Sequence, residues 1–186
     1  MQNTATNVIA ICLAVTLLFV VPLVALTERN DNVVQENVEL IVEQFVNEVQ
    51  NTGTITTAKY EGLENSLVAT GNTYDIEMEI QHLDENPGKK TTQANYTKIG
   101  ENVYYSEYTT QILSKLGIGT ETSGSNTSAN SSKTIKLKEG DRIVVSVKNT
   151  NDTQAQILKG SLLSFSNAGQ YTISASKTGM ITVDGQ

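Results

Sequence analysis

The sequence predicts an α+β protein: a long N-terminal hydrophobic helix, a membrane span that continues into an amphipathic helix, and a C-terminal antiparallel β-rich head. Three observations predict this architecture. The stretch Val8–Leu26 holds 17 apolar residues among 19 and no charged one. Apolar residues then recur at the helical spacings of 3 and 4 between Val34 and Val49. From Tyr74 onward, short runs alternate apolar and polar residues, as strands do.

The first stretch has the length of a membrane span. As a helix it extends about 28 Å, close to the ~30 Å hydrocarbon layer of a bilayer. A cleaved signal peptide would have a basic beginning and an apolar core of only about 7 to 15 residues, whereas residues 1–7 carry no Lys or Arg. A buried core helix would keep a polar face. The predicted anchor and filament-core side chains are Val8, Ile9, Ile11, Leu13, Val15, Leu17, Leu18, Phe19, Val20, Val21, Leu23 and Leu26.

The composition fits an exported, anchored protein. The 186 residues include 13 Lys and Arg against 20 Asp and Glu, a net charge of −7, which argues against a nucleic-acid partner because phosphates require a basic surface. The one cysteine, Cys12, lies in the predicted span, so no disulfide or cysteine metal site is expected outside the membrane. The protein is expected in the cell membrane, with the acidic part after the span on the extracytoplasmic side. If it assembles into a filament, it is expected at the cell surface.

An amphipathic helix is expected to follow the span and to end before Gly53. With the span it would form one rod of about 65 Å, whose second half needs protein cover. Part of that cover is expected from the chain's own sheet, and part from neighbouring helices. The predicted helix-packing residues are Val34, Val38, Ile41, Val42, Phe45, Val46 and Val49.

The rest of the first half is predicted as a short helix over 57–69 and a strand over 74–81 that ends at a turn over 84–88. Residues 89–100 are expected to be a loop or an edge strand. A strand over 101–108, a short helix over 109–116 and an exposed loop over 119–132 complete it.

The tail is predicted to hold two hairpins. The first joins strands around Ile135 and Ile143 through Glu139-Gly140-Asp141, and the second joins strands around Ile173 and Ile181 through Lys177-Thr178-Gly179. Between them, the apolar residues from Ile157 to Phe165 fit a strand or irregular cover. The resulting segments are 1–27 (core helix), 28–71 (amphipathic and second helices), 72–118 (first β-rich part), 119–133 (loop) and 134–186 (β-rich tail).

Catalytic and metal sites are not expected. His82 is the only histidine and lacks partners at a metal-ligand spacing, and no nucleophilic triad is visible. Asp75, Glu77 and Glu79 share one strand face and are expected to be solvated, because the loop pattern of a calcium site is absent. Asp84, Glu85 and Asn86 fit a turn. The sequence therefore predicts a protein that is not an enzyme and takes no cofactor.

Four asparagines begin Asn-x-Ser/Thr triplets in predicted loops or turns and are candidate glycosylation acceptors. They are Asn95, Asn126, Asn130 and Asn151. In a chain rich in Asn and Thr, such triplets also arise by chance.

A family resemblance rests on residue types over Val8–Gln81, under half of the chain. The residues that carry it are Phe45 and Val49, Gly53-Thr54-Ile55, Tyr60, Leu63, Leu67, Gly71 and the strand Tyr74–Met78. With the span and the β-rich head, this arrangement is similar to type IV pilins and pseudopilins. It resembles in particular the pseudopilins of tight-adherence (Tad) systems and the pilin-like proteins of Gram-positive conjugation and secretion clusters. The chain lacks a Gly-Phe prepilin cleavage junction and a Glu five residues into the span, so the processing and assembly roles of those features do not carry over.

The resemblance and the uncovered apolar length together predict a structural pilin-like subunit. It would be anchored before assembly and would pack through its N-terminal helix with copies of itself, or with related subunits, in a surface filament or pseudopilus. The alternative is a bitopic accessory or binding protein of a secretion or conjugation apparatus, with an extracytoplasmic interaction head.

Overall fold

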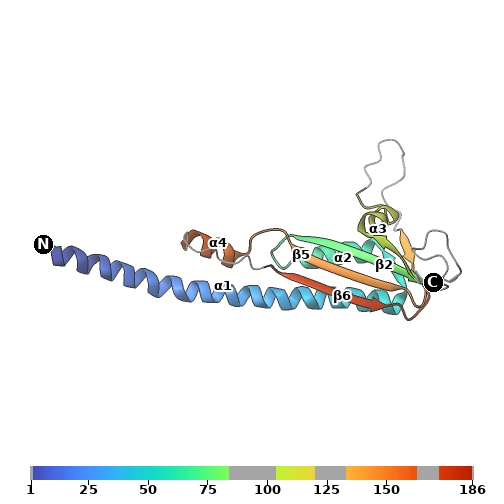
Figure 1. Ribbon diagram of the computed structural model, residues 1–186, viewed down its shortest axis with the longest axis horizontal. Helices are drawn as coiled ribbons and strands as arrows, with labels where there is room; N and C mark the ends of the chain where they lie inside the picture. Colours follow the sequence, from blue (N-terminus) through green and yellow to red (C-terminus); the bar gives the residue numbers. More distant parts are fainter. Residues whose placement is uncertain (1, 84–103, 120–132, 163–171, 186) are drawn as a thin grey trace, which may run out of the picture.

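The computed structural model describes residues 2–83, 104–119, 133–162 and 172–185. It has the predicted α+β layout, with one long N-terminal helix followed by antiparallel sheets. Figure 1 shows the first half of this helix projecting from the head and the second half lying along it. The predicted turn at 84–88, the segment 89–100 and nearly all of the loop at 119–132 lie outside the described residues.

Helix α1 (Gln2–Thr52) joins the apolar stretch and the amphipathic stretch without a break, and it runs through Pro22. The predicted rod is therefore a single helix. It ends at Gly53, whose φ of +61° is the left-handed conformation that glycine adopts without strain. A Cβ at Gly53 would also lie 2.3 Å from the carbonyl oxygen of Val183, so the C-terminal segment packs directly on this turn.

The main sheet has four antiparallel strands in the order β3-β2-β5-β6. Its members are β2 (Tyr74–Leu83), β3 (Tyr104–Tyr108), β5 (Arg142–Asn149) and β6 (Ser174–Met180). In β2 and β5, alternate residues are buried, and Ile76 pairs with Val147 and Ile80 with Ile143. The alternation read from the sequence thus identifies the face that carries the core.

The remaining elements are smaller. Strands β1 (Thr54–Thr56) and β4 (Thr134–Lys136) form a separate two-stranded sheet. Helix α2 (Thr57–Val68) begins after Thr56, whose hydroxyl accepts a hydrogen bond from the Lys59 backbone N–H. Helix α3 (Thr109–Leu116) ends at Gly117, as predicted. Helix α4 (Gln154–Leu162) follows β5 and lies beyond the end of the main sheet, toward the N-terminus of α1 (Figure 1).

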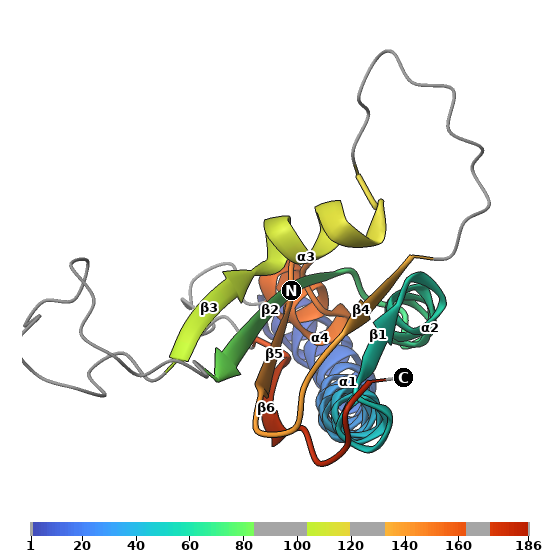
Figure 2. The same ribbon diagram turned by 90° about the vertical axis from the view of Figure 1, so that its right-hand side faces the viewer.

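The core lies between the inner face of the main sheet and the two helices α1 and α2, which lie on the same side of it (Figure 2). α1 contributes its amphipathic stripe, α2 contributes Tyr60, Leu63 and Leu67, and α3 closes one end with Ile112 and Leu116. The head therefore builds its hydrophobic core around the second half of α1.

Three predictions for the tail are wrong. β4 pairs with β1, not with β5, so the first hairpin does not form. The residues expected to turn at Lys177–Gly179 lie inside β6, which runs along β5. The segment from Gln154 to Leu162 is helix α4, where a strand or irregular cover was expected.

Candidate functional site

The most distinctive surface of the molecule is the uncovered half of α1. Every residue from Thr4 to Phe19 is exposed, and the exposed fraction reaches 70% at Leu18 and 69% at Phe19. Among the described residues, α1 is the one helix long and apolar enough to cross a membrane, and its most apolar window is 0% buried. A signal sequence near an N-terminus passes the same test of length and hydropathy, so this property is common to an anchor and a signal sequence.

The predicted anchor residues belong to this uncovered surface almost without exception. Val20 is half-buried. The large exposed side chains of the segment are Val8, Ile9, Ile11, Leu13, Val15, Leu17, Leu18, Phe19, Val21, Leu23 and Leu26. Because they surround the helix on all sides, water is a poor environment for it and lipid or other apolar helices are a good one.

The predicted helix-packing residues are covered by the chain's own head. Six of them are buried, namely Val34, Val38, Val42, Phe45, Val46 and Val49, and Ile41 is half-buried. The head itself therefore covers the six buried side chains, as was expected for part of the stripe, and packing of neighbouring helices on the rest stays a prediction. The apolar residues that this half leaves exposed are Val33 (48%) and Leu40 (55%). The large apolar surface that the head leaves exposed is thus the first half of α1.

Two glutamines of α1 bind the free edge of β6. Gln35 pairs with Ser174 through both atoms of its amide, since Oε1 accepts the Ser174 N–H (3.0 Å) and Nε2 donates to the Ser174 carbonyl (2.7 Å). Gln50 Nε2 donates to the carbonyl of Met180 (3.0 Å). Between them, Gly179 allows close approach, because a Cβ there would lie 2.6 Å from Val46 Cγ1. The helix and the strand are thereby held together at both ends of β6.

A junction between α1 and α4 lies where the covered half of α1 begins. The Thr153 hydroxyl donates a 2.6 Å hydrogen bond to the carboxylate of Asp31, and both residues are buried. Three residues nearer the N-terminus, Glu28 forms a 2.5 Å ion pair with Lys159 of α4. Val20, Val24 and Thr27 are half-buried here, and they continue the buried stripe toward the N-terminus. The sequence patterns missed this junction, although Asp31 interrupts an apolar stripe and is a signal of a buried polar partner.

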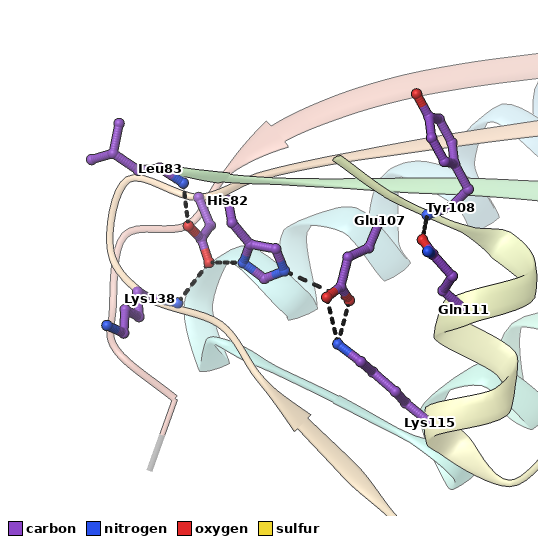
Figure 3. Close-up of polar contacts among 8 residues, drawn as sticks. His82, Leu83, Glu107, Tyr108, Gln111, Lys115 and Lys138 are labelled. Carbon is purple, nitrogen blue, oxygen red and sulfur yellow. Dashed lines mark hydrogen bonds and ion pairs between the residues drawn. The ribbon is translucent and has the colours of Figure 1, made fainter. Parts of the chain in front are cut away.

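A polar cluster lies at the opposite end of the sheet (Figure 3). His82 Nδ1 lies 2.9 Å from Asp141 Oδ2, and its Nε2 lies 3.8 Å from Glu107, which pairs with Lys115. Asp141 also accepts the backbone N–H groups of Leu83 and Lys138. The carboxylate therefore fastens the turn before β5 to the end of β2.

This cluster has the properties of a structural network. The described residues contain no group of three or more His, Cys, Asp and Glu side chains that could hold a metal ion. The His82 ring stacks on Tyr105 with the ring centroids 4.9 Å apart, and its Nδ1 lies against the Asp141 carboxylate. Asp141 accepts hydrogen bonds from backbone N–H groups, and Glu107 pairs with Lys115. Such contacts hold loops in place.

The acidic face of β2 carries Asp75, Glu77 and Glu79, as its alternation predicts. The hydroxyl of Ser106 and the amide of Gln81 both donate to Glu79, and these hydrogen bonds lower the pKa of the Glu79 carboxyl. On the core side, burial raises the pKa of the Tyr60 hydroxyl, and the charges of Glu64 and Asp75 raise it further. Asp84, Glu85 and Asn86 lie outside the described residues.

Asn151 is the one candidate glycosylation acceptor that the structure describes, and Asn95, Asn126 and Asn130 lie outside it. Its side chain accepts the N–H of Thr73 and donates to the side chain of Asn72. Asn151 therefore joins the start of β2 to the end of β5.

A search of protein families, of curated proteins and of solved structures finds no match to this chain.

Proposed function

We propose that this chain is a structural pilin-like subunit without enzymatic activity. Val8–Leu26 anchors it in the cell membrane with the head on the extracytoplasmic side, and the same surface packs against copies of itself or related subunits when a surface filament or pseudopilus assembles. The observation that carries the proposal is the uncovered apolar half of α1, which is 0% buried in its most apolar window and continuous with the helix inside the head.

The continuity of α1 supports the structural role. A flexible anchor would need only a linker between membrane and head, whereas here one helix of 51 residues belongs to both. The head fixes the helix through a buried stripe and through the Gln35 and Gln50 contacts to β6. Subunits that pack through the uncovered half would therefore also fix the orientation of their heads.

Because the head covers the second half of α1, contact between subunits is expected mainly through the first half. Helix-to-helix contact is expected over residues 4–26. Since Val8–Leu26 holds no charged side chain, its packing is expected to rest on shape and apolar contact.

Photo-crosslinking at single positions tests this proposal. A photoreactive side chain at Leu18, which is 70% exposed, is expected to give a ladder of homotypic products in cells that express the protein. The matched control is Asn47, an exposed polar residue of α1 inside the head, which is expected to give far fewer. Equal yields at the two positions would contradict packing through the apolar half.

The alternative is a bitopic accessory protein of a secretion or conjugation apparatus. Its support is the self-contained head, which buries its own stripe and needs no neighbouring helix for its core. One dominant heterologous product from Leu18, with no homotypic ladder, would favour it. Electron microscopy of purified surface filaments, with density traced to this sequence, separates the two functions directly, because the accessory protein would not form the filament wall.

A further inference from the structure

Helix α4 runs along α1 toward the apolar half. Thr153, the residue before α4, binds Asp31, and Lys159 within α4 binds Glu28. From Thr153 to Lys159 the partner on α1 changes from Asp31 to Glu28, so α4 runs toward the N-terminus of α1. Figure 1 shows the same relation, with α4 beside α1 on the N-terminal side of the main sheet.

The length of α4 places its end level with the apolar segment. Its nine residues extend about 13 Å, which is the rise of about nine residues of α1. Counted back from Asp31, this reaches the level of Pro22. The half-buried side chains of Val20 and Val24 lie at this level and indicate that α1 is partly covered here.

If α1 spans a bilayer, the edge of the hydrocarbon layer lies near Leu26, and the level of Pro22 lies about 6 Å inside it. The segment Val8–Leu26 extends about 28 Å and the hydrocarbon layer is about 30 Å thick, so the whole segment is needed to cross the layer. The headgroup layer adds about 5 to 7 Å on each side. The last two turns of α4 then pass from the headgroup layer into the outer part of the hydrocarbon layer.

The side chains at this level suit a lipid boundary. Ile157 is 61% exposed on the side of α4 away from the buried Ala155. Lys159 keeps 30% of its side chain exposed beside the apolar surface, and Arg29 is exposed on α1. Long basic side chains reach headgroup phosphates from such positions, while a branched apolar side chain enters the acyl boundary.

We propose that α4 is a membrane-contact helix: in the anchored protein its C-terminal turns enter the headgroup layer of the leaflet from which the head emerges, with Ile157 and Lys159 against lipid. The head then lies against the bilayer surface. Without this contact, α1 alone would hold the head at a distance from the bilayer. This inference depends on the proposed anchoring of α1.

Depth-dependent fluorescence quenching of the full chain in phosphatidylcholine vesicles tests the proposal. In a Cys12→Ala background, a single fluorophore is placed at Gly160→Cys on α4, at Thr178→Cys on β6, or at Leu17→Cys in the apolar segment. A side chain at Gly160 meets no atom within 4 Å, so the label fits. Thr178 is exposed and precedes Gly179, where an added Cβ would lie 2.6 Å from Val46 Cγ1. Thr178 therefore lies at the level of Val46 on α1, 20 residues beyond Leu26, the end of the proposed span.

A nitroxide on the lipid headgroup is expected to quench the label at 160 at least about twofold more than the label at 178, because only the former reaches the headgroup layer. Equal quenching at 160 and 178, with the label at 17 quenched by a nitroxide on the acyl chain, overturns the role of α4 and leaves the anchor intact. Absence of acyl-chain quenching at 17 overturns the anchoring itself and this inference with it.

A second variant separates lipid contact from the mere position of α4. Ile157→Asp is expected to reduce headgroup quenching at 160 without changing acyl-chain quenching at 17, since it puts a charge where the apolar side chain enters. Ser176→Asp, on the outer face of the sheet, is the matched control and is expected to change neither. No effect of Ile157→Asp would contradict a lipid contact at this side chain.

Discussion

Gln35 and Ser174 form a two-bond amide pair across 139 residues of sequence, in which the side chain of a helix takes the place of a neighbouring strand. Ser174 begins β6, the edge strand of the main sheet. Its N–H and carbonyl both bind the Gln35 amide, so this position of the edge is saturated as it would be inside a sheet. The first turn of α1 inside the head is thus fixed to the start of β6.

Gln35→Ala is expected to lower the free energy of unfolding by about 1 to 2 kcal/mol, because two hydrogen bonds are lost and the Ser174 backbone groups turn to water. The measurement is thermal unfolding of the full chain in detergent, followed by near-ultraviolet circular dichroism of its tyrosines. Gln44→Ala, an exposed position of the same helix, is the control and should stay within about 0.5 kcal/mol of the parent. Equal losses in both variants would show that the pair has no special role.

Gly179→Ala is expected to destabilise the head by about 1 to 3 kcal/mol, because the added methyl would lie 2.6 Å from side-chain atoms of Val46 and Gln50 and would push β6 from α1. Gly62→Ala in α2 is the matched control. Its Cβ meets nothing within 4 Å, and alanine raises helix propensity by up to about 1 kcal/mol. The same thermal unfolding assay should therefore move in opposite directions for the two variants.

Thr153→Val is expected to loosen α4. It removes the donor to the buried Asp31 carboxylate and an acceptor for the Gln156 N–H, which together cost about 2 to 3 kcal/mol. Hydrogen exchange of the α4 amides should rise, while exchange in β5 should change little. Lys159→Ala removes only a partly exposed ion pair and should cost less than about 1 kcal/mol. A larger effect from Lys159→Ala than from Thr153→Val would contradict this order.

Glu79 is expected to make stability fall in acid. Its pKa is lowered from 4.5 in the folded protein, chiefly by the Ser106 hydrogen bond. A lowered pKa in the folded state stabilises the fold above the unfolded value, and this contribution is lost as pH falls through the folded value. The loss therefore begins near pH 4.5 and continues below it.

Ser106→Ala is expected to raise the pKa of Glu79 and to flatten this part of the stability profile. The measurement is a carbon NMR titration of the Glu79 carboxyl, together with thermal unfolding across the acid range. Ser146→Ala, on the neighbouring strand β5, is the control because Ser146 pairs with Glu77 in the ladder, whereas Glu79 pairs with Val144. An unchanged Glu79 titration in Ser106→Ala would contradict the assigned cause.

The sequence predicted elements whose signals are local. The period in α1, the alternation in β2, and the glycines after α1 and α3 all report the backbone near them, and the structure agrees at each place. The long apolar first half of α1 was likewise predictable, because an apolar segment without charges is recognised from its own residues.

The pairing of the tail was not predictable because its determinants are distant. β4 joins β1, a strand of three residues that carries no alternation long enough to read. Gly179 indicates a turn by composition, yet it lies inside β6 because the helix surface at Val46 and Gln50 needs the space. The α4 junction depends on Asp31 and Thr153, which lie 122 residues apart. These relations arise from packing and leave no periodic trace in the chain.

The glutamine contacts to β6 also limit how this molecule can associate with its copies. An open strand edge invites another strand to add to it, which is the first step toward cross-β fibres at high local concentration. Here the outer edge of β6 lies against the molecule's own helix and is bound at Ser174 and Met180. Crowded copies therefore cannot join sheets through β6 without first pulling the helix away, so the contact that holds α1 on the sheet also protects this edge from aggregation.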